Sequence, residues 1–219
     1  MTDIVCISPI DGREVARRQS ASQAEIDRVL SEARAAQKMW RDVPLAERMA
    51  KLTAFVDSML TMSAEAVPEL AIQMGRPVKW GGEFRGFEER ARHMIKIAPE
   101  SLAAHLPQPK EGFTRFIEKT PIGIVFVIAP WNYPYLTAVN SIVPALIAGN
   151  AVILKHAAQT LLVGERFAKA MEAAHLPKGL FTNLVLTHDD TAKILSSHAV
   201  DHCVFTGSVA GGRVIEKAA

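Results

Sequence analysis

The sequence predicts an α/β protein in which an N-terminal helical segment precedes a doubly wound, Rossmann-like parallel sheet. The run Ile122–Ile128 is continuously apolar and rich in β-branched residues, as expected of a parallel strand buried on both faces. After it, three more short apolar runs alternate with helical patterns. The pattern changes near residue 112, so we expect a hairpin and helical region over 1–111 and an α/β region over 112–219.

Composition narrows the function classes. Hydrophobic residues make up 49% of the 219 residues and charged residues 22%, which is typical of a folded domain. The net charge of +2 provides no strong field for nucleic acid or an anionic membrane. No charge occurs between Lys119 and Lys155, but prolines and asparagines interrupt this stretch, so we expect no membrane span. With only Cys6 and Cys203, and no signal peptide, a cytoplasmic location is expected.

The first region begins with a predicted hairpin. The run Ile4–Ile7 is apolar, a Pro-Ile-Asp-Gly turn follows, and Glu14–Ala16 returns. Ser22 and Glu25 then form a capping-box pattern at the start of a helical stripe. Helices are expected at residues 22–40, 44–60, 63–75 and 78–98.

The second region begins with an alternating stretch, Phe113–Lys119, which predicts a strand with one exposed face. After the strand at 122–128, helices are expected at 135–148, 160–174, 189–197 and from 209, with strands at 151–154, 181–186 and 202–205. In such a sheet ligands bind outside the carboxyl ends of the strands. The turns to inspect are therefore 129–134, 155–160, 186–188 and 206–212.

Glycines dominate the last of these turns. Gly207 and Gly212 flank a strand-to-helix corner, and Ser208 adds a hydroxyl. Backbone N–H groups at a helix start attract phosphate, although a turn that simply needs glycine is an equal alternative. Arg213 and Val214 follow instead of the lysine and hydroxyl of a Walker A loop, which disfavours phosphoryl transfer.

Several polar residues are candidates on the other turns. Asn132, between prolines on a rigid turn, has an amide that can donate to an oxyanion or can tie down its own turn. Lys155 can reach a phosphate or ribose, or lie at a solvated strand end. We expect His156 to be a surface or packing residue, and Cys6 and Cys203 to be structural. No spacing indicates a metal site.

Four segments together closely resemble the aldehyde dehydrogenase superfamily. They are PWNYP at 130–134, VPALIAGNAVILK at 143–155, LPKG at 176–179 and FTGSVAGGRVI at 205–215. The resemblance covers essentially the whole chain. It implies oxidation of an aldehyde to an acid with NAD or NADP, through a catalytic cysteine and a glutamate that activates water.

The resemblance also implies that residues 112–219 are the NAD(P)-binding α/β region, and it implies residue roles there. Asn132 matches the oxyanion-hole asparagine. Cofactor-binding positions are Ile128, Ala129, Pro130, Trp131, Lys155, Ala158, Thr206, Gly207, Ser208 and Gly212. Lys155 matches the lysine that binds adenosine ribose, and the glycine turn matches the pyrophosphate site. The family usually has glutamate where Ala158 stands, so NADP is expected to be tolerated.

The family's catalytic cysteine and glutamate belong to segments downstream of this sequence. We therefore expect the cofactor-binding part of an aldehyde dehydrogenase, inactive as this chain alone, which forms a homo-oligomer or joins a complementary C-terminal chain. One half of a split enzyme, and a non-catalytic nucleotide-binding or assembly module, are the alternatives. A glutamyl-phosphate reductase type is a further one, which Asn132 within PWNYP disfavours.

Overall fold

Four parallel strands form the central sheet of the computed structural model, which describes residues 1–81 and 83–219. They are β3 (Ile124–Ile128), β4 (Ala151–Lys155), β5 (Phe181–Asn183) and β6 (His202–Phe205), in the order β5-β4-β3-β6. The chain moves outward from β3 to β5 and then crosses back to β6 beyond β3. This reversal places a switch point between β3 and β6, where α/β sheets form ligand crevices.

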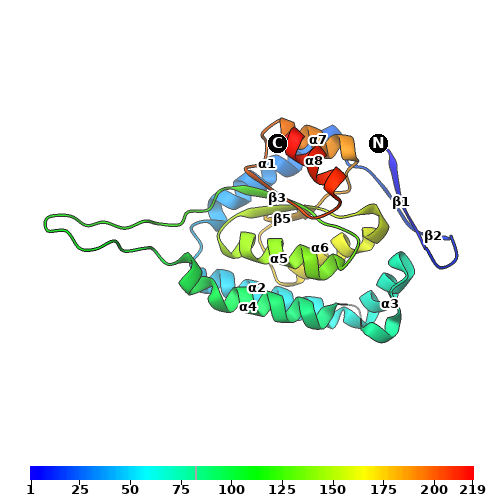
Figure 1. Cartoon of the computed structure of the whole chain (residues 1–219), viewed down its shortest axis with the longest axis horizontal. Helices are drawn as coiled ribbons and strands as arrows, with labels where there is room; N and C mark the ends of the chain where they lie inside the picture. The colour runs from blue at the N-terminus through cyan, green and yellow to red at the C-terminus, as the bar shows by residue number, and fades with distance from the viewer. Residues whose placement is uncertain (82) are drawn as a thin grey trace.

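Helices cover both faces of this sheet (Figure 1). On one face lie α5 (Pro134–Ile147) and α6 (Leu161–Ala173), and on the other lie α1 (Gln23–Trp40), α7 (His188–Ser196) and α8 (Val209–Ala218). The predicted doubly wound α/β architecture is therefore confirmed.

A third layer lies beyond α5 and α6. It consists of α2 (Leu45–Thr61) and α4 (Phe84–Leu102), with α3 (Ser63–Met74) at its end (Figure 1). A short 3₁₀ turn, η1 (Val78–Trp80), follows α3. The predicted third helix ends as expected, because Gly75 takes a left-handed φ of +76° that closes α3.

The N-terminal hairpin is also confirmed. Strands β1 (Asp3–Ile7) and β2 (Glu14–Gln19) pair antiparallel. The Ser22 hydroxyl oxygen then accepts a hydrogen bond from the Glu25 amide at 3.2 Å and caps α1. The hairpin contacts η2 (Ala158–Thr160), so it lies near the carboxyl end of β4.

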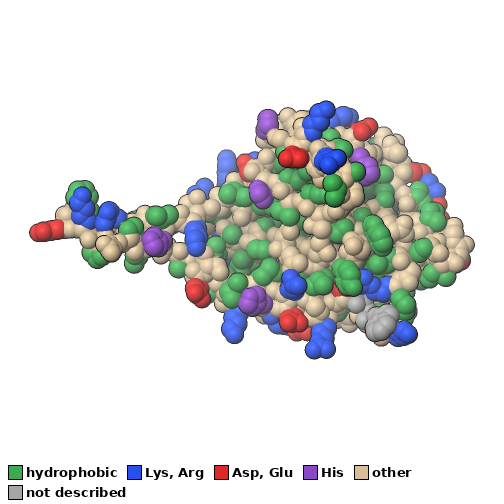
Figure 2. Space-filling model, viewed as in Figure 1, with side chains coloured by type: hydrophobic (Ala, Val, Ile, Leu, Met, Phe, Trp, Pro, Cys, Tyr) green, Lys and Arg blue, Asp and Glu red, His purple; other side chains and the backbone are tan. Residues whose placement is uncertain are grey.

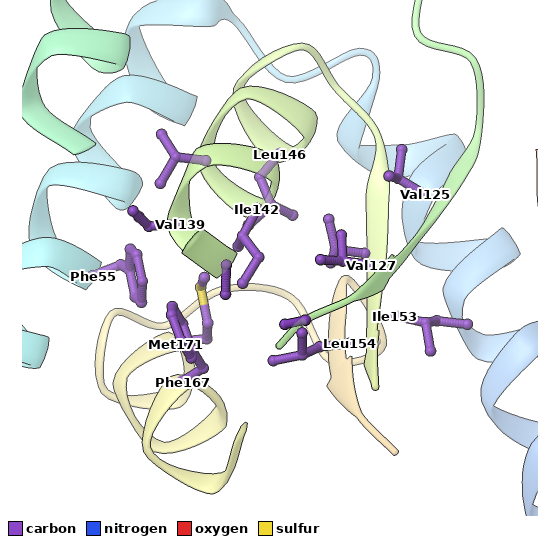
Figure 3. Close-up of a cluster of buried hydrophobic side chains, with 14 of the residues drawn as sticks. Phe55, Val125, Val127, Val139, Ile142, Leu146, Ile153, Leu154, Phe167 and Met171 are labelled. Carbon is purple, nitrogen blue, oxygen red and sulfur yellow. The ribbon is translucent and has the colours of Figure 1, made fainter. Parts of the chain in front are cut away.

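The main core lies between the sheet and the layers of α5, α6 and α2 (Figure 3). Phe55 of α2 stacks on Phe167 of α6 with ring centroids 6.2 Å apart, and Val139 and Leu154 point into the same cluster. Ile153 points to the opposite face, toward α1, as strand alternation requires. The core contains residues from both sides of the division at 111/112, which stays a prediction.

The prediction of a strand at Phe113–Lys119 is wrong. Residues 103–121 form an extended arm that projects from the body, and only two isolated bridges join its sides, at His105↔Ile117 and Lys110↔Phe113. Figure 2 shows hydrophobic and basic side chains gathered on this arm. A two-stranded ribbon is marginal without a surface that covers its apolar face, and the body of the molecule lies too far away to provide one.

Two other boundaries differ from the prediction. Helix α4 begins at Phe84 rather than Val78, because Gly81, at a φ of +64°, ends η1 first. It continues through Pro99 to Leu102, whereas the sequence predicted an end at 98. Strand β5 stops at Asn183, three residues early. No helix in the described ranges is long and apolar enough to cross a membrane.

Candidate functional site

A cavity of about 600 Å³ opens at the carboxyl ends of the four strands. Every strand contributes to its wall, at Ile128, Lys155, Asn183 and Phe205. The remaining lining comes from the hairpin, η2, α6, α7, α8 and the turns that follow the four strands, at Ile4, Ala129, His156, Ala157, Ala158, Leu161, Leu184, Val185, Leu186, Thr187, His188, Thr191, Thr206, Gly211, Val214 and Ile215. The volume is in the range of small-molecule and cofactor pockets. No carboxylate is present among these lining residues.

The cavity gathers about half of the predicted cofactor-binding residues. Ile128, Ala129, Lys155, Ala158 and Thr206 line it together. The others lie outside its lining, although Gly211 within the glycine turn reaches it. These others are Pro130, Trp131, Gly207, Ser208 and Gly212, together with the predicted oxyanion donor Asn132. The roles themselves stay predictions.

Lys155 ends β4, and its side chain is buried rather than solvated. The residue is 7% exposed, and burial lowers the pKa of its ammonium group. Across residues 1–81 and 83–219, no carboxylate pairs with it. A buried cation without a counter-charge is costly unless something polar pairs with it. Its position in the cavity wall makes it a cation available to a ligand.

His156, next to Lys155, is a packing residue. Its Nδ1 accepts a hydrogen bond from the Ala157 amide at 2.9 Å and lies 3.1 Å from the Thr160 hydroxyl. Its Nε2 lies 3.5 Å from the carbonyl oxygen of Pro134. Burial lowers the pKa of the ring to about 4, so the imidazole is neutral near pH 7. His156 therefore links the β4 turn to the start of α5.

The glycine turn has an internal reason for its glycines. A Cβ atom on Gly207 would lie 2.5 Å from the Phe205 ring, and one on Gly211 would lie 2.9 Å from it. Ser208 caps α8, because its hydroxyl oxygen accepts a hydrogen bond from the Gly211 amide at 3.1 Å. The turn thus accommodates Phe205 as well as presenting the N-terminus of α8 toward the cavity.

The turn that carries Asn132 lies between β3 and α5. Within the described part of the chain, the Asn132 side chain makes no hydrogen bond, so it does not tie down its own turn as one alternative required. Trp131 is 52% exposed. Tyr133 takes a left-handed φ of +51°, and Pro134 then begins α5. Asn132 therefore has an unused amide on a sharply bent turn.

Neither cysteine has the environment of a nucleophile. Cys6 is buried, its Sγ donates a hydrogen bond to the Gln159 carbonyl at 3.0 Å, and burial raises its pKa. Burial also raises the pKa of Cys203 in β6 to about 11. A reactive thiol needs a lowered pKa, so both are placed as packing residues. In the described residues, no three His, Cys, Asp or Glu side chains gather as a metal site.

Part of the cavity wall consists of residues that the sequence did not predict as site residues. Thr187 caps α7, since its hydroxyl oxygen accepts a hydrogen bond from the Asp190 amide at 3.0 Å, and it lines the cavity with Leu186 and His188. The sequence indicates the turn at 186–188 as a strand end and singles out no residue within it. Ile4 lines the cavity because the hairpin lies beside η2, a long-range contact that no local pattern encodes.

Comparison with known proteins is consistent across the whole chain. The model of the aldehyde dehydrogenase family matches residues 1–219. A 4,4'-diapolycopene aldehyde oxidase from Methylomonas sp is 31% identical over 221 residues, which cover 98% of this chain and 42% of that protein.

Solved structures have the same fold. An NADP-dependent glyceraldehyde-3-phosphate dehydrogenase from Bacillus halodurans C-125, complexed with NADP, has a TM-score of 0.91 and 27% identity over 100% of this chain and 47% of its own. PnpE in complex with nicotinamide adenine dinucleotide has a TM-score of 0.89 and 27% identity, and the match covers 99% of this chain and 45% of that chain. The chain spans less than half the length of these three proteins.

Proposed function

Because the chain belongs to the aldehyde dehydrogenase family, we propose that its cavity holds NAD or NADP and that it is the cofactor-binding part of an enzyme that oxidises an aldehyde to a carboxylic acid. The observation that carries this proposal is the cavity itself, with the unpaired Lys155 in its wall at the strand ends. The two solved relatives above are complexed with NADP and with nicotinamide adenine dinucleotide.

The residues of the cavity fit a dinucleotide. Its volume suits a cofactor, and the Lys155 ammonium group has the charge and donors to bind ribose hydroxyls. The first N–H groups of α8 have no partners within the helix, apart from the Gly211 amide that Ser208 caps. They would bind the pyrophosphate beside Gly207 and Gly212.

The other predicted cofactor-binding residues lie at or after the carboxyl ends of β3 and β6. Ile128 ends β3, residues 129–131 follow it, and Thr206 follows β6 at the same edge of the sheet; of these, Ile128, Ala129 and Thr206 line the cavity. We propose that these five residues line the adenosine and ribose path.

Cofactor choice rests on charge. With no carboxylate among the lining residues, nothing there repels a 2′-phosphate. Ala158 lies exposed at the cavity rim, where a glutamate would provide that repulsion and bind ribose hydroxyls. We propose that the site accepts NADP as well as NAD.

NAD or NADP held in this cavity would supply the hydride acceptor for the oxidation of the aldehyde. The Asn132 amide would stabilise the oxyanion of the tetrahedral adduct, because its donors are free on a fixed turn. Neither Cys6 nor Cys203 is placed to form that adduct. We therefore propose that the thiol and the general base of the complete enzyme come from residues outside these 219, in the same chain or a complementary one.

A nucleotide-binding module without turnover is the second candidate, and the raised pKa of both cysteines favours it for these residues alone. Aldehyde-dependent NAD(P)H production after addition of the missing catalytic segments separates the two proposals.

Calorimetry with NAD and NADP tests nucleotide binding, which both candidate functions require. The parent chain is expected to bind both, and Lys155→Met to weaken binding at least about tenfold, since a charge-assisted hydrogen bond contributes about 1.5–3 kcal/mol. Lys193→Met is the matched control, because Lys193 lies on α7 beside the cavity but its side chain is 70% exposed. Equal affinities for the parent and Lys155→Met would refute the assignment of Lys155.

A further inference from the structure

Glu83 connects two helices at the base of the Asn132 turn. Its backbone carbonyl accepts the hydrogen bond from the Phe87 amide that begins α4, 2.8 Å away. Its carboxylate points the other way and accepts a hydrogen bond from the Leu136 amide, in the first turn of α5, at 2.8 Å. The side chain is only 1% exposed. The junction before α4 therefore caps α5 across 53 residues of sequence.

Helix α5 needs this external cap. Its N-cap residue is Tyr133, whose side chain makes no capping hydrogen bond. Serine, threonine, aspartate or asparagine at that position would provide an oxygen, and tyrosine does not. A carboxylate at a helix N-terminus also interacts favourably with the helix dipole. Glu83 thus performs from another element the function that the local sequence lacks.

Arg76 completes the arrangement. Its guanidinium donates a hydrogen bond to the second Glu83 oxygen at 2.6 Å, and its Cζ lies 4.5 Å from the centre of the Tyr133 ring. Arg76 is therefore the counter-charge of a buried carboxylate and a cation over the aromatic ring. That ring belongs to the residue held at a left-handed φ of +51°, a conformation that costs a non-glycine residue energy.

We propose that Arg76 and Glu83 are positioning residues, which fix the turn at residues 130–136 so that the Asn132 amide keeps one orientation. Arg76 holds Tyr133, which follows Asn132, and Glu83 holds the start of α5 three residues further on. The inference rests on the proposed function only for the role of Asn132 as oxyanion donor. The fixed conformation of the turn is a property of the chain by itself.

The effect on catalysis follows from the geometry. Arg76 and Glu83 are not among the residues that line the cavity, and they form no hydrogen bond or ion pair with Lys155, Ala158 or Thr206 in the described part of the chain. Loosening the turn would therefore reach the proposed cofactor site only through Pro130 and Trp131, and it should weaken cofactor binding less than the loss of Lys155 does. It would lower kcat in a complete enzyme by about tenfold or more, since misplacement of a catalytic donor by about 1 Å can cost about 100-fold.

The test uses the 219-residue chain with 5-fluorotryptophan, which gives one ¹⁹F resonance for each tryptophan. Trp131 lies in the turn, and Trp40, 1% exposed in the core, reports on global folding. Glu83→Gln is expected to shift or broaden the Trp131 resonance, leave Trp40 unchanged, and accelerate amide exchange at Leu136 about tenfold or more. Calorimetry with NADP on the same sample is expected to show a smaller loss of affinity than the loss of about tenfold expected for Lys155→Met.

Arg76→Lys provides a second, gentler variant, because it keeps the charge opposite Glu83 and loses the planar group over Tyr133. It is expected to move Trp131 while Leu136 exchange stays near the parent rate. Glu88→Gln is the matched control, since Glu88 forms an exposed pair with Arg92 on α4. If Glu83→Gln unfolds the chain, the Trp131 resonance of Arg76→Lys decides whether the turn depends on this pair.

An unmoved Trp131 resonance and unchanged Leu136 exchange in a folded variant would overturn the inference. The same outcome in Glu88→Gln as in Glu83→Gln would overturn it too, because the effect would not belong to the turn. If the parent chain binds no NADP, the proposed function fails, and the ¹⁹F and exchange data still decide the positioning.

Discussion

Acidification is expected to destabilise the fold through His156. The buried ring has a pKa of about 4 in the folded chain, against an ordinary value of 6.5. Between these values the unfolded chain binds a proton at this ring and the folded chain does not. The free energy of unfolding must therefore fall as the pH is lowered from about 6.5 to about 4. Below about pH 4 both states are protonated, and this contribution stays constant.

The size of the effect follows from the same two values. Each pH unit between them corresponds to about 1.4 kcal/mol, so full protonation of His156 removes about 3 kcal/mol. The free energy of unfolding of a typical domain is about 5–15 kcal/mol. The loss is a large part of such a total, and it is larger than the uncertainty of a free energy measured by urea unfolding. Carboxylates also titrate in this range, so the effect must be read as a difference between variants.

His156→Asn isolates the ring. An asparagine Oδ1 can take the place of Nδ1 and accept from the Ala157 amide, and it cannot be protonated in this range. Urea unfolding of the parent and His156→Asn at intervals from pH 7.5 to 3.5 is the assay, with the exposed His93→Asn as control. The variant should gain about 3 kcal/mol relative to the parent as the pH falls. Parallel profiles would contradict the burial of a neutral imidazole.

Three further predictions concern the cofactor, the chemistry and the core. Ala158→Glu should raise the ratio of NAD to NADP affinity, measured by calorimetry, because a carboxylate at the rim repels a 2′-phosphate; an unchanged ratio counts against the proposed ribose path. The 219-residue chain with aldehyde and NAD or NADP should show no absorbance increase at 340 nm, and turnover that Cys203→Ser abolishes would contradict the structural role of that thiol. Phe167→Ala should lower the free energy of unfolding by about 3–5 kcal/mol, since the ring is fully buried against Phe55; a loss under about 1 kcal/mol would contradict that packing.

Local patterns predicted the parts of the fold that depend on neighbours in sequence. The Ser22 cap, the Gly75 helix end and the fully buried strands β3 and β4 each follow from residues within a few positions. The arm at 103–121 was misread, because alternation describes a face and says nothing about whether another element covers it.

The candidate site was predictable only in part, for the same reason. Strand ends and the glycine turn could be found from the sequence, whereas the burial of Lys155 depends on the packing around β4. The cap that Glu83 provides for Leu136 spans 53 residues, and the contact of Gly207 with the Phe205 ring depends on a turn that folds back on its own strand. Contacts of this kind arise from tertiary structure rather than from spacing.

The most direct test of the proposed function is a crystal structure of the chain grown with NADP. We expect the nucleotide in the cavity at the strand ends, with the adenosine ribose within hydrogen-bond distance of Lys155 Nζ and the pyrophosphate at the N-terminus of α8. Nucleotide bound elsewhere on the chain, or an empty cavity at saturating NADP, would contradict the proposal.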